Sequence, residues 1–254
     1  ILNILNHQCL IATKSARVCY AAKGDGVMEF GLRRAQGPDA GTYGARAAVI
    51  GGCTGTSNVL AGQLFDVPVK GTHAHSWIMS FPDEYTAFKK YAELYPSACI
   101  LLVDTYDTLK SGMPNAIRVF KEMREAGIPL TFYGIRMDSG DLAYLSKKVR
   151  KMLDEAGFPD AVISASNDLD EYLIESLKLQ GAVITSWGVG TNLITAKDNP
   201  ALLPVQIAYY TGLRIGEVCG LTWQDINLEE QYLTVRRSIC LLYTSPSPRD
   251  RQKS

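Results

Sequence analysis

Two of the chain's three histidines stand two positions apart, in the polar segment 71–77 (GTHAHSW). The apolar run 67–69 precedes this segment and a helix-like stretch follows it, so we expect a turn at the carboxyl end of a strand. A neutral imidazole can accept a proton or a phosphoryl group near pH 7. His73 and His75 could therefore act in catalysis, hydrogen-bond a loop or bind a metal ion. No third ligand stands at a zinc-like spacing, which disfavours the metal site.

Arginine and aspartate side chains follow two other apolar runs. Arg33 stands in the segment 29–34 (EFGLRR), and its guanidinium offers paired donors for a phosphate or a carboxylate. Asp104 follows the run 100–103 and could hold ribose hydroxyls or a magnesium-bound diphosphate. A helix N-cap is the common use of an aspartate such as the nearby Asp107.

The segment 136–141 (RMDSGD) repeats this arrangement, with Arg136 and Asp138 as candidates for anion and hydroxyl binding. Ser139 or Asp141 could simply cap the next helix. The segment 188–191 (GVGT) could cradle a phosphate with backbone N–H groups, although tight turns use the same residues. Together these segments predict a site for a phosphorylated sugar.

The surrounding sequence alternates short apolar runs with longer amphipathic segments, which predicts a mostly parallel sheet with helices outside it. Polar residues follow nearly every expected strand. In an α/β barrel the site is formed by residues at the ends of many strands, whereas in an open sheet it lies at one topological switch point. We therefore predict an incomplete parallel α/β barrel. The expected strands are 27–30, 67–69, 100–103, 131–135, 161–163 and 182–184. The expected helices are 2–22, 39–50, 57–65, 83–94, 115–126, 141–156 and 168–180.

Composition excludes several classes of protein. The 254 residues are 46% hydrophobic, which suffices for a core, and their 26 basic and 26 acidic residues give no net charge that favours nucleic acid or an anionic membrane. Six scattered cysteines without a CxxC pair indicate reduced thiols and a cytoplasmic protein. No stretch is apolar enough to span a bilayer. The chain starts inside an amphipathic pattern without a methionine, so we expect further residues ahead of it.

Five segments in order resemble bacterial nicotinate phosphoribosyltransferases, over about residues 1–202. The resemblance implies a barrel of the type II phosphoribosyltransferase kind. It also implies an enzyme that joins nicotinate to phosphoribosyl diphosphate for NAD biosynthesis, with magnesium, ATP as co-substrate and a homodimeric assembly. The segments are 29–38 (EFGLRRAQGP), 71–77 (GTHAHSW), 103–112 (VDTYDTLKSG), 135–142 (IRMDSGDL) and 187–195 (WGVGTNLIT).

The same resemblance assigns roles to individual residues. It implies that ATP transiently phosphorylates His75 and that Arg33 lies beside the base and the diphosphate. His75, Asp104 and Asp138 are expected to be catalytic. The remaining substrate-binding residues are Arg136 and Ser139 at the phosphoribosyl and diphosphate groups, and Gly188, Gly190 and Thr191 at the 5′-phosphate.

The sequence changes character after about residue 202. Residues 209–225 (YYTGLRIGEVCGLTWQD) resemble the start of a tyrosine recombinase, or phage integrase, catalytic domain, with Arg214 at the first catalytic arginine. The later histidine–arginine motif and the nucleophilic tyrosine are absent, which argues against DNA cleavage. We expect a small helical and hairpin fragment over 203–239, and a disordered tail over 240–254 that resembles translated sequencing-adapter sequence.

Two other functions compete with the enzyme that uses nicotinate. One is a DNA-binding recombinase module, which the basic residues near the end of the chain would support, although nucleic acid is not the expected partner. The other is a phosphoribosyltransferase that uses nicotinamide, because an amide and a carboxylate differ by only a few contacts.

Overall fold

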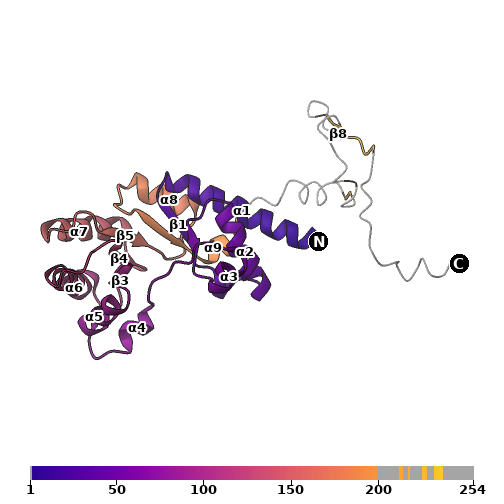
Figure 1. Cartoon of the computed structure of the whole chain (residues 1–254). Helices are drawn as coiled ribbons and strands as arrows, with labels where there is room; N and C mark the ends of the chain where they lie inside the picture. Colours follow the sequence, from indigo (N-terminus) through magenta and orange to yellow (C-terminus); the bar gives the residue numbers. More distant parts are fainter. Residues whose placement is uncertain (1, 199–211, 214–216, 218–224, 228–231, 237–254) are drawn as a thin grey trace. The chain divides into compact units, whose positions relative to one another are not determined.

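The computed structural model describes residues 2–198, 212–213, 217, 225–227 and 232–236. The chain divides into two units, residues 1–199 and residues 200–254, and the first unit contains a six-stranded parallel sheet (Figure 1). Its strands are β1 (Gly26–Glu29), β2 (Gly55–Thr56), β3 (Cys99–Leu102), β4 (Tyr133–Met137), β5 (Val162–Ala165) and β6 (Ser186–Val189).

Helices separate the strands along the chain, as the alternating pattern predicts. They are α1 (Leu2–Ala22), α2 (Pro38–Ile50), α3 (Val59–Phe65), α4 (His75–Met79), α5 (Glu84–Leu94), α6 (Met113–Glu125), α7 (Leu142–Glu155), α8 (Glu171–Leu179) and α9 (Thr191–Ile194). A 3₁₀ turn, η1 (Leu32–Arg34), follows β1, and a π-helical turn, η2 (Thr108–Gly112), precedes α6.

The strand order β2-β1-β6-β5-β4-β3 makes the sheet an incomplete barrel, as predicted. The last strand pairs with the first, since Gly26 and Glu29 of β1 are in register with Ser186 and Val189 of β6. The opening therefore lies between β2 and β3. Residues 67–75 cross it: Val69 forms an isolated bridge with Thr56 at one edge, and the His73 ring accepts the Leu102 N–H at the other.

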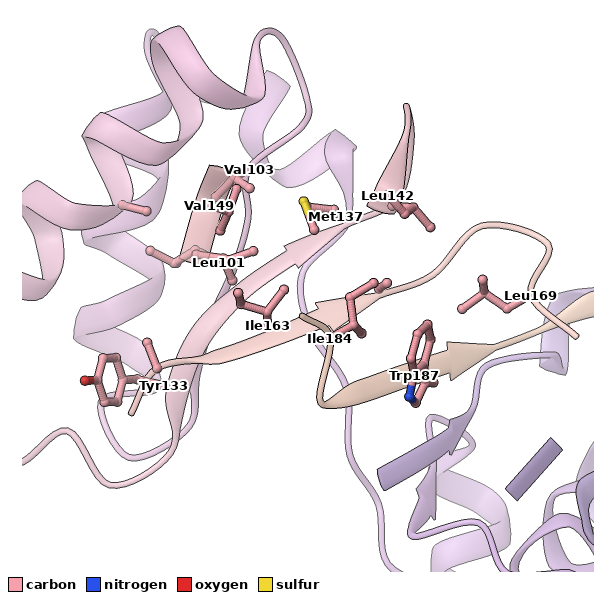
Figure 2. Packing of buried hydrophobic residues seen from close by; sticks show 14 of the residues in the cluster. Leu101, Val103, Tyr133, Met137, Leu142, Val149, Ile163, Leu169, Ile184 and Trp187 are labelled. Carbon is pink, nitrogen blue, oxygen red and sulfur yellow. The ribbon is translucent and has the colours of Figure 1, made fainter. Parts of the chain in front are cut away.

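The outer face of the sheet packs against the helices (Figure 2). Alternate strand residues such as Leu101, Ile135, Ile163 and Trp187 are 0–1% exposed and belong to one hydrophobic cluster. Because successive side chains of a strand point to opposite faces, the residues between them point into the barrel. The inner face therefore carries Ile100, Arg136, Ser164, Ser166, Ser186 and Gly188, which is where a site can be built.

Polar contacts fix the ends and positions of the helices. Asp83, Asp141 and Asp170 each accept a backbone N–H two or three residues into the following helix, and such caps are worth about 1 kcal/mol each. A buried ion pair joins α1 to α8, with Lys14 Nζ 2.6 Å from a Glu171 carboxylate oxygen. The sequence predicts α1 correctly, and most other helices lie within a few residues of their expected bounds.

Two strand predictions are wrong. Residues 67–69 pair with the β2 edge only at Val69, through backbone hydrogen bonds of Thr56 with Pro68 and Lys70, so they add a single parallel bridge and no strand. The run 182–184 is not a strand either, and β6 begins at Ser186. There the barrel interior requires small residues, since a Cβ atom on Gly188 would stand 2.7 Å from the Phe30 ring. The two-residue strand β2 was not predicted, because it is too short to show a period.

The second unit contains a short antiparallel pair, β7 (Ile226–Asn227) and β8 (Tyr232–Leu233). This pair agrees with the expected hairpin. The other predictions for this unit lie outside the described residues: Arg214, most of the expected helical part ahead of the hairpin, and the expected disordered tail over 240–254. Among the helices in the described part of the chain, none is long and apolar enough to cross a membrane.

Candidate active site

Arg136 lies at the carboxyl end of β4 with its guanidinium held on three sides. Nε donates a hydrogen bond to the Ser166 hydroxyl and Nη1 donates to the Thr72 hydroxyl, each at 2.8 Å. Nη2 lies 3.4 Å from the Asp138 carboxylate. The side chain is only 16% exposed, so these contacts fix a cation whose position varies little. Such a group is suited to bind a phosphate or a diphosphate.

Asp104 follows the neighbouring strand β3 and reaches across to the loop after β4. Its Oδ2 accepts the backbone N–H of Asp138 at 2.6 Å and the Ser139 hydroxyl at 2.7 Å. Its Oδ1 is buried and has no hydrogen-bond partner among the described residues. One carboxylate oxygen therefore orders the protein, and the other is left for a ligand.

His75 begins α4 and faces this pair of aspartates from the segment that crosses the barrel opening. Its Nδ1 lies 3.1 Å from the Thr105 hydroxyl, and its Nε2 lies 3.6 Å from Asp138 Oδ2. The ring is 37% exposed, so a ligand in solution can reach it. The structure thus brings His75, Asp104, Arg136, Asp138 and Ser139 together, as the sequence predicts for one site.

His73 has a different role from its neighbour. It is 7% exposed, its Nε2 accepts the Leu102 backbone N–H at 3.2 Å, and Tyr91 packs edge-on against it with ring centroids 4.6 Å apart. Burial, together with a smaller effect of the nearby Arg136 charge, lowers the pKa of His73 to about 4. His73 is therefore neutral near pH 7 and holds a loop, which is one of the alternatives that the sequence left open.

Gly188 and Gly190 lie at the end of β6, beside the arginine. The position of Gly188 on the inner face leaves space for the Phe30 ring, and the Arg136 guanidinium lies 5.7 Å from the centre of that ring. Gly190 precedes the single turn α9, which begins at Thr191. These residues are thus near the cluster, whereas a turn beginning at Gly188 is not formed because β6 continues to Val189.

Arg33 is the predicted site residue that the cluster does not include. It lies in the exposed turn η1, and within the described chain no hydrogen bond or ion pair holds its guanidinium. The turn rests on the buried Glu29 carboxylate, which accepts the Gly31 backbone N–H and the Thr56 hydroxyl. Burial raises the pKa of Glu29 above its usual value. The turn is therefore anchored, and Arg33 projects freely from it.

Three hydroxyl groups were not predicted as part of the cluster. Thr72 contacts Arg136 and Thr105 contacts His75. The Ser166 hydroxyl accepts from Arg136 and donates to Asp138 Oδ1 at 2.5 Å. Serine and threonine are common in turns, so their types alone carried no signal. The position of Ser166 directly after β5 was the available clue.

A cavity of about 770 Å³ lies in the barrel interior toward the amino ends of the strands, with Ala98, Phe132 and Val162 on its wall. Thr72, which binds Arg136, lies on its wall, and Ser164 and Ser186 are in register on adjacent strands there. Aromatic and aliphatic side chains form much of the remaining wall. His75, Asp104, Arg136 and Asp138 do not line this cavity, so it is separate from the cluster.

Comparison with protein-family models gives two matches. The nicotinate phosphoribosyltransferase (NAPRTase) family model matches residues 26–206, and the phage integrase family model matches residues 191–241. The first match covers most of the chain. The second falls largely outside the described residues.

Individual relatives give the same picture. The chain is 62% identical over 202 residues to nicotinate phosphoribosyltransferase of Bacillus subtilis, covering 80% of this chain and 40% of that protein. It is 31% identical over 256 residues to the human nicotinate phosphoribosyltransferase, covering 80% of this chain and 47% of that protein. The chain therefore spans less than half the length of these curated relatives.

Solved structures support the fold. A crystal structure of human nicotinic acid phosphoribosyltransferase matches with a TM-score of 0.66 and 32% identity, over 72% of this chain and 47% of the human chain. A nicotinate-nucleotide pyrophosphorylase from Pyrococcus furiosus matches with a TM-score of 0.64 and 28% identity, over 75% of this chain and 48% of its own.

Proposed function

We propose a function from one premise: this chain belongs to the nicotinate phosphoribosyltransferase family. The proposed reaction joins nicotinate to phosphoribosyl diphosphate, forms nicotinate mononucleotide and releases diphosphate, with coupled ATP hydrolysis. This reaction would place the intact protein in NAD biosynthesis in the cytoplasm. The proposed domains are the barrel fragment 1–202, the integrase-like fragment 203–239 and the tail 240–254.

The cluster of Arg136 with Asp104 and Asp138 at adjacent strand ends carries this proposal. Departure of diphosphate leaves positive charge on the ribose ring and adds negative charge to the leaving group. A carboxylate near the ring and a fixed guanidinium near the diphosphate stabilise these two charges. We assign Asp138 to the ribose, because Arg136 lies 3.4 Å from its carboxylate and can bind the diphosphate beside it.

Magnesium fits the oxygen atoms of this cluster. Asp104 Oδ1 is a buried carboxylate oxygen without a partner in the described chain, and Mg²⁺ prefers a few carboxylate oxygens together with substrate phosphates and water. No group of three or more His, Cys, Asp or Glu side chains gathers around one point in the described residues. Asp104 would therefore hold a cation that arrives with the diphosphate. Such a cation supplies charge neutralisation for the leaving group.

His75 is the proposed acceptor of a phosphoryl group from ATP. A ring nitrogen would form the new N–P bond as the bond from the γ-phosphorus to the ADP oxygen breaks, and ADP would leave. The 3.6 Å separation between Nε2 and Asp138 supports this role, because the carboxylate can orient the ring and take up its proton. The added negative charge would then reorganise the edge of the site.

The 5′-phosphate and the base of the substrate are assigned to segments outside the cluster. The turn at Gly190 and Thr191 would bind the 5′-phosphate through backbone N–H groups, and Arg33 would reach the base or the diphosphate from its exposed turn. We propose a homodimer for the intact protein, because the family resemblance implies shared sites.

A turnover assay on the purified chain tests this proposal. Labelled nicotinate or labelled nicotinamide is supplied with phosphoribosyl diphosphate, magnesium and ATP, and the His75→Ala variant is compared with His7→Ala as the matched control. We expect a mononucleotide from nicotinate, unchanged in the control and at least tenfold less with His75→Ala. Preferential use of nicotinamide would show that nicotinamide, and not nicotinate, is the substrate. Full ATP-coupled turnover by His75→Ala would refute the role of this histidine.

The match to the phage integrase family model supports a second candidate, a DNA-binding module. Of its basic residues, the described Arg236 lies 3.4 Å from the Asp225 carboxylate, which reduces the charge available for DNA. We expect no binding to duplex DNA at physiological salt. Binding that weakens steeply as salt increases would instead favour the recombinase module.

A further inference from the structure

Two cysteines from different elements of the first unit lie close together. Cys19 lies on α1, and Cys53 lies in the loop between α2 and β2. Cys53 Sγ lies 3.1 Å from the hydroxyl of Ser15, which stands one helical turn before Cys19 on α1. A Cβ atom on Gly52 would stand 3.3 Å from Cys19 Sγ, which confirms that this sulfur lies against the loop. Both sulfurs belong to free thiols.

The two thiols differ in reactivity. Cys19 is half-buried and can meet a small solute, whereas Cys53 is 4% exposed. The hydrogen bond from Cys53, with a further one from Ser15, lowers the pKa of Cys19 because both stabilise the thiolate. The interaction with Cys19 and burial raise the pKa of Cys53, so it stays protonated. Cys19 is therefore the nucleophile, with a resolving thiol beside it.

We propose that a hydroperoxide converts this pair into a Cys19–Cys53 disulfide. The Cys19 thiolate attacks the peroxide, so that an S–O bond forms, the O–O bond breaks and a hydroxide or alkoxide leaves. Cys53 then attacks the sulfur of the sulfenic acid, the S–S bond forms and the S–O bond breaks. The proton of Cys53 goes to the departing hydroxide as water. The two thiols lose two electrons in total, and the peroxide accepts them.

The bond would join α1 to the backbone that leads into β2. Thr56 of that strand donates to the Glu29 carboxylate, which in turn accepts the Gly31 N–H at the base of the exposed arginine turn. Oxidation would therefore tighten the framework behind that turn. This inference does not depend on the proposed enzymatic function.

Peptide mapping of the full chain after treatment with hydrogen peroxide tests the proposal. Trypsin separates the two cysteines, because it cuts after Arg17, Lys23 and Arg46. We expect one linked peptide pair, containing Cys19 and Cys53, that disappears on reduction. The thermal midpoint should rise by roughly 5 °C on oxidation. Cys9→Ser is the matched control, since Cys9 is an exposed cysteine on the same helix, and it should leave both results unchanged.

A second variant keeps the test informative if the linked pair is difficult to detect. With Cys53→Ala, Cys19 has no resolving partner and should accumulate a sulfenic acid that dimedone labels. Labelling of Cys19 in this variant, together with its absence in the oxidised wild type, supports the proposal. Linked peptides that join other cysteines, or Cys19 that stays reduced while Cys9 is oxidised, would overturn it.

Discussion

The carboxylate of Asp104 accepts the backbone N–H of Asp138 at 2.6 Å, so the ends of β3 and β4 are joined by a hydrogen bond to a charged group. This contact orients the loop that carries the second aspartate, and it leaves the Asp138 side chain to face Arg136 on one side and His75 on the other. The positions of Arg136, His75 and Asp138 relative to one another thus depend on the contact that Asp104 makes.

Replacing Asp104 should disrupt ligand binding more than folding. We expect Asp104→Ala to weaken phosphoribosyl diphosphate binding roughly ten- to hundredfold, because hydrogen bonds to a charged group and the unpartnered carboxylate oxygen are both lost. Asp107→Ala is the matched control. Asp107 caps η2 by accepting the Leu109 and Lys110 N–H groups, so its loss should cost about 1 kcal/mol of stability without changing affinity. Equal losses of affinity in both variants would contradict the assignment.

A methyl group at Gly188 should act on the arginine through an aromatic ring. The new Cβ atom would stand 2.7 Å from the Phe30 ring, so Phe30 must move, and Arg136 lies over that ring. We expect Gly188→Ala to reduce the affinity for phosphoribosyl diphosphate about tenfold. Gly71→Ala is the control, since nothing lies within 4 Å of a Cβ there. Unchanged affinity in Gly188→Ala would show that Phe30 does not position the guanidinium.

The buried His73 should make the stability of the chain depend on pH. Its pKa is lowered to about 4 in the folded chain, against about 6.5 when unfolded, so the unfolded state binds more protons between these values. The free energy of unfolding therefore falls as the pH decreases through this window, by about 2 kcal/mol between pH 7 and pH 5. Urea denaturation should give a smaller fall for His73→Gln. An identical pH dependence in both proteins would exclude this contribution.

The sequence predicts the fold well where a residue pattern reports burial directly. The three- and four-residue spacing in α1 gives the helix correctly, because one face of it packs on α2 and α8. The error at β6 has a physical cause. Ser186 and Gly188 look like turn residues, but they lie on the inner face of the barrel, and at Gly188 the Phe30 ring leaves no room for a larger side chain.

The site is predicted only in part for a similar reason. The order of residues along the chain brings Asp104 and Asp138 to adjacent strand ends, so their association could be expected. Nothing in the segment 71–77 separates the buried His73 from His75, which faces the two aspartates, because burial against Tyr91 depends on a helix that comes later in the sequence. The hydroxyl of Ser166 likewise gains its role only when β5 lies beside β4.

Calorimetric titration of the full chain with phosphoribosyl diphosphate and magnesium tests the central claim most directly. The account predicts saturable binding with one site per barrel, and a roughly ten- to hundredfold loss in Arg136→Met because a fixed charge-assisted contact is removed. Arg118→Met, which removes an exposed arginine packed on Tyr85, should bind like the wild type. Equal affinity in the wild type, Arg136→Met and Arg118→Met would contradict the claim that this cluster binds the substrate.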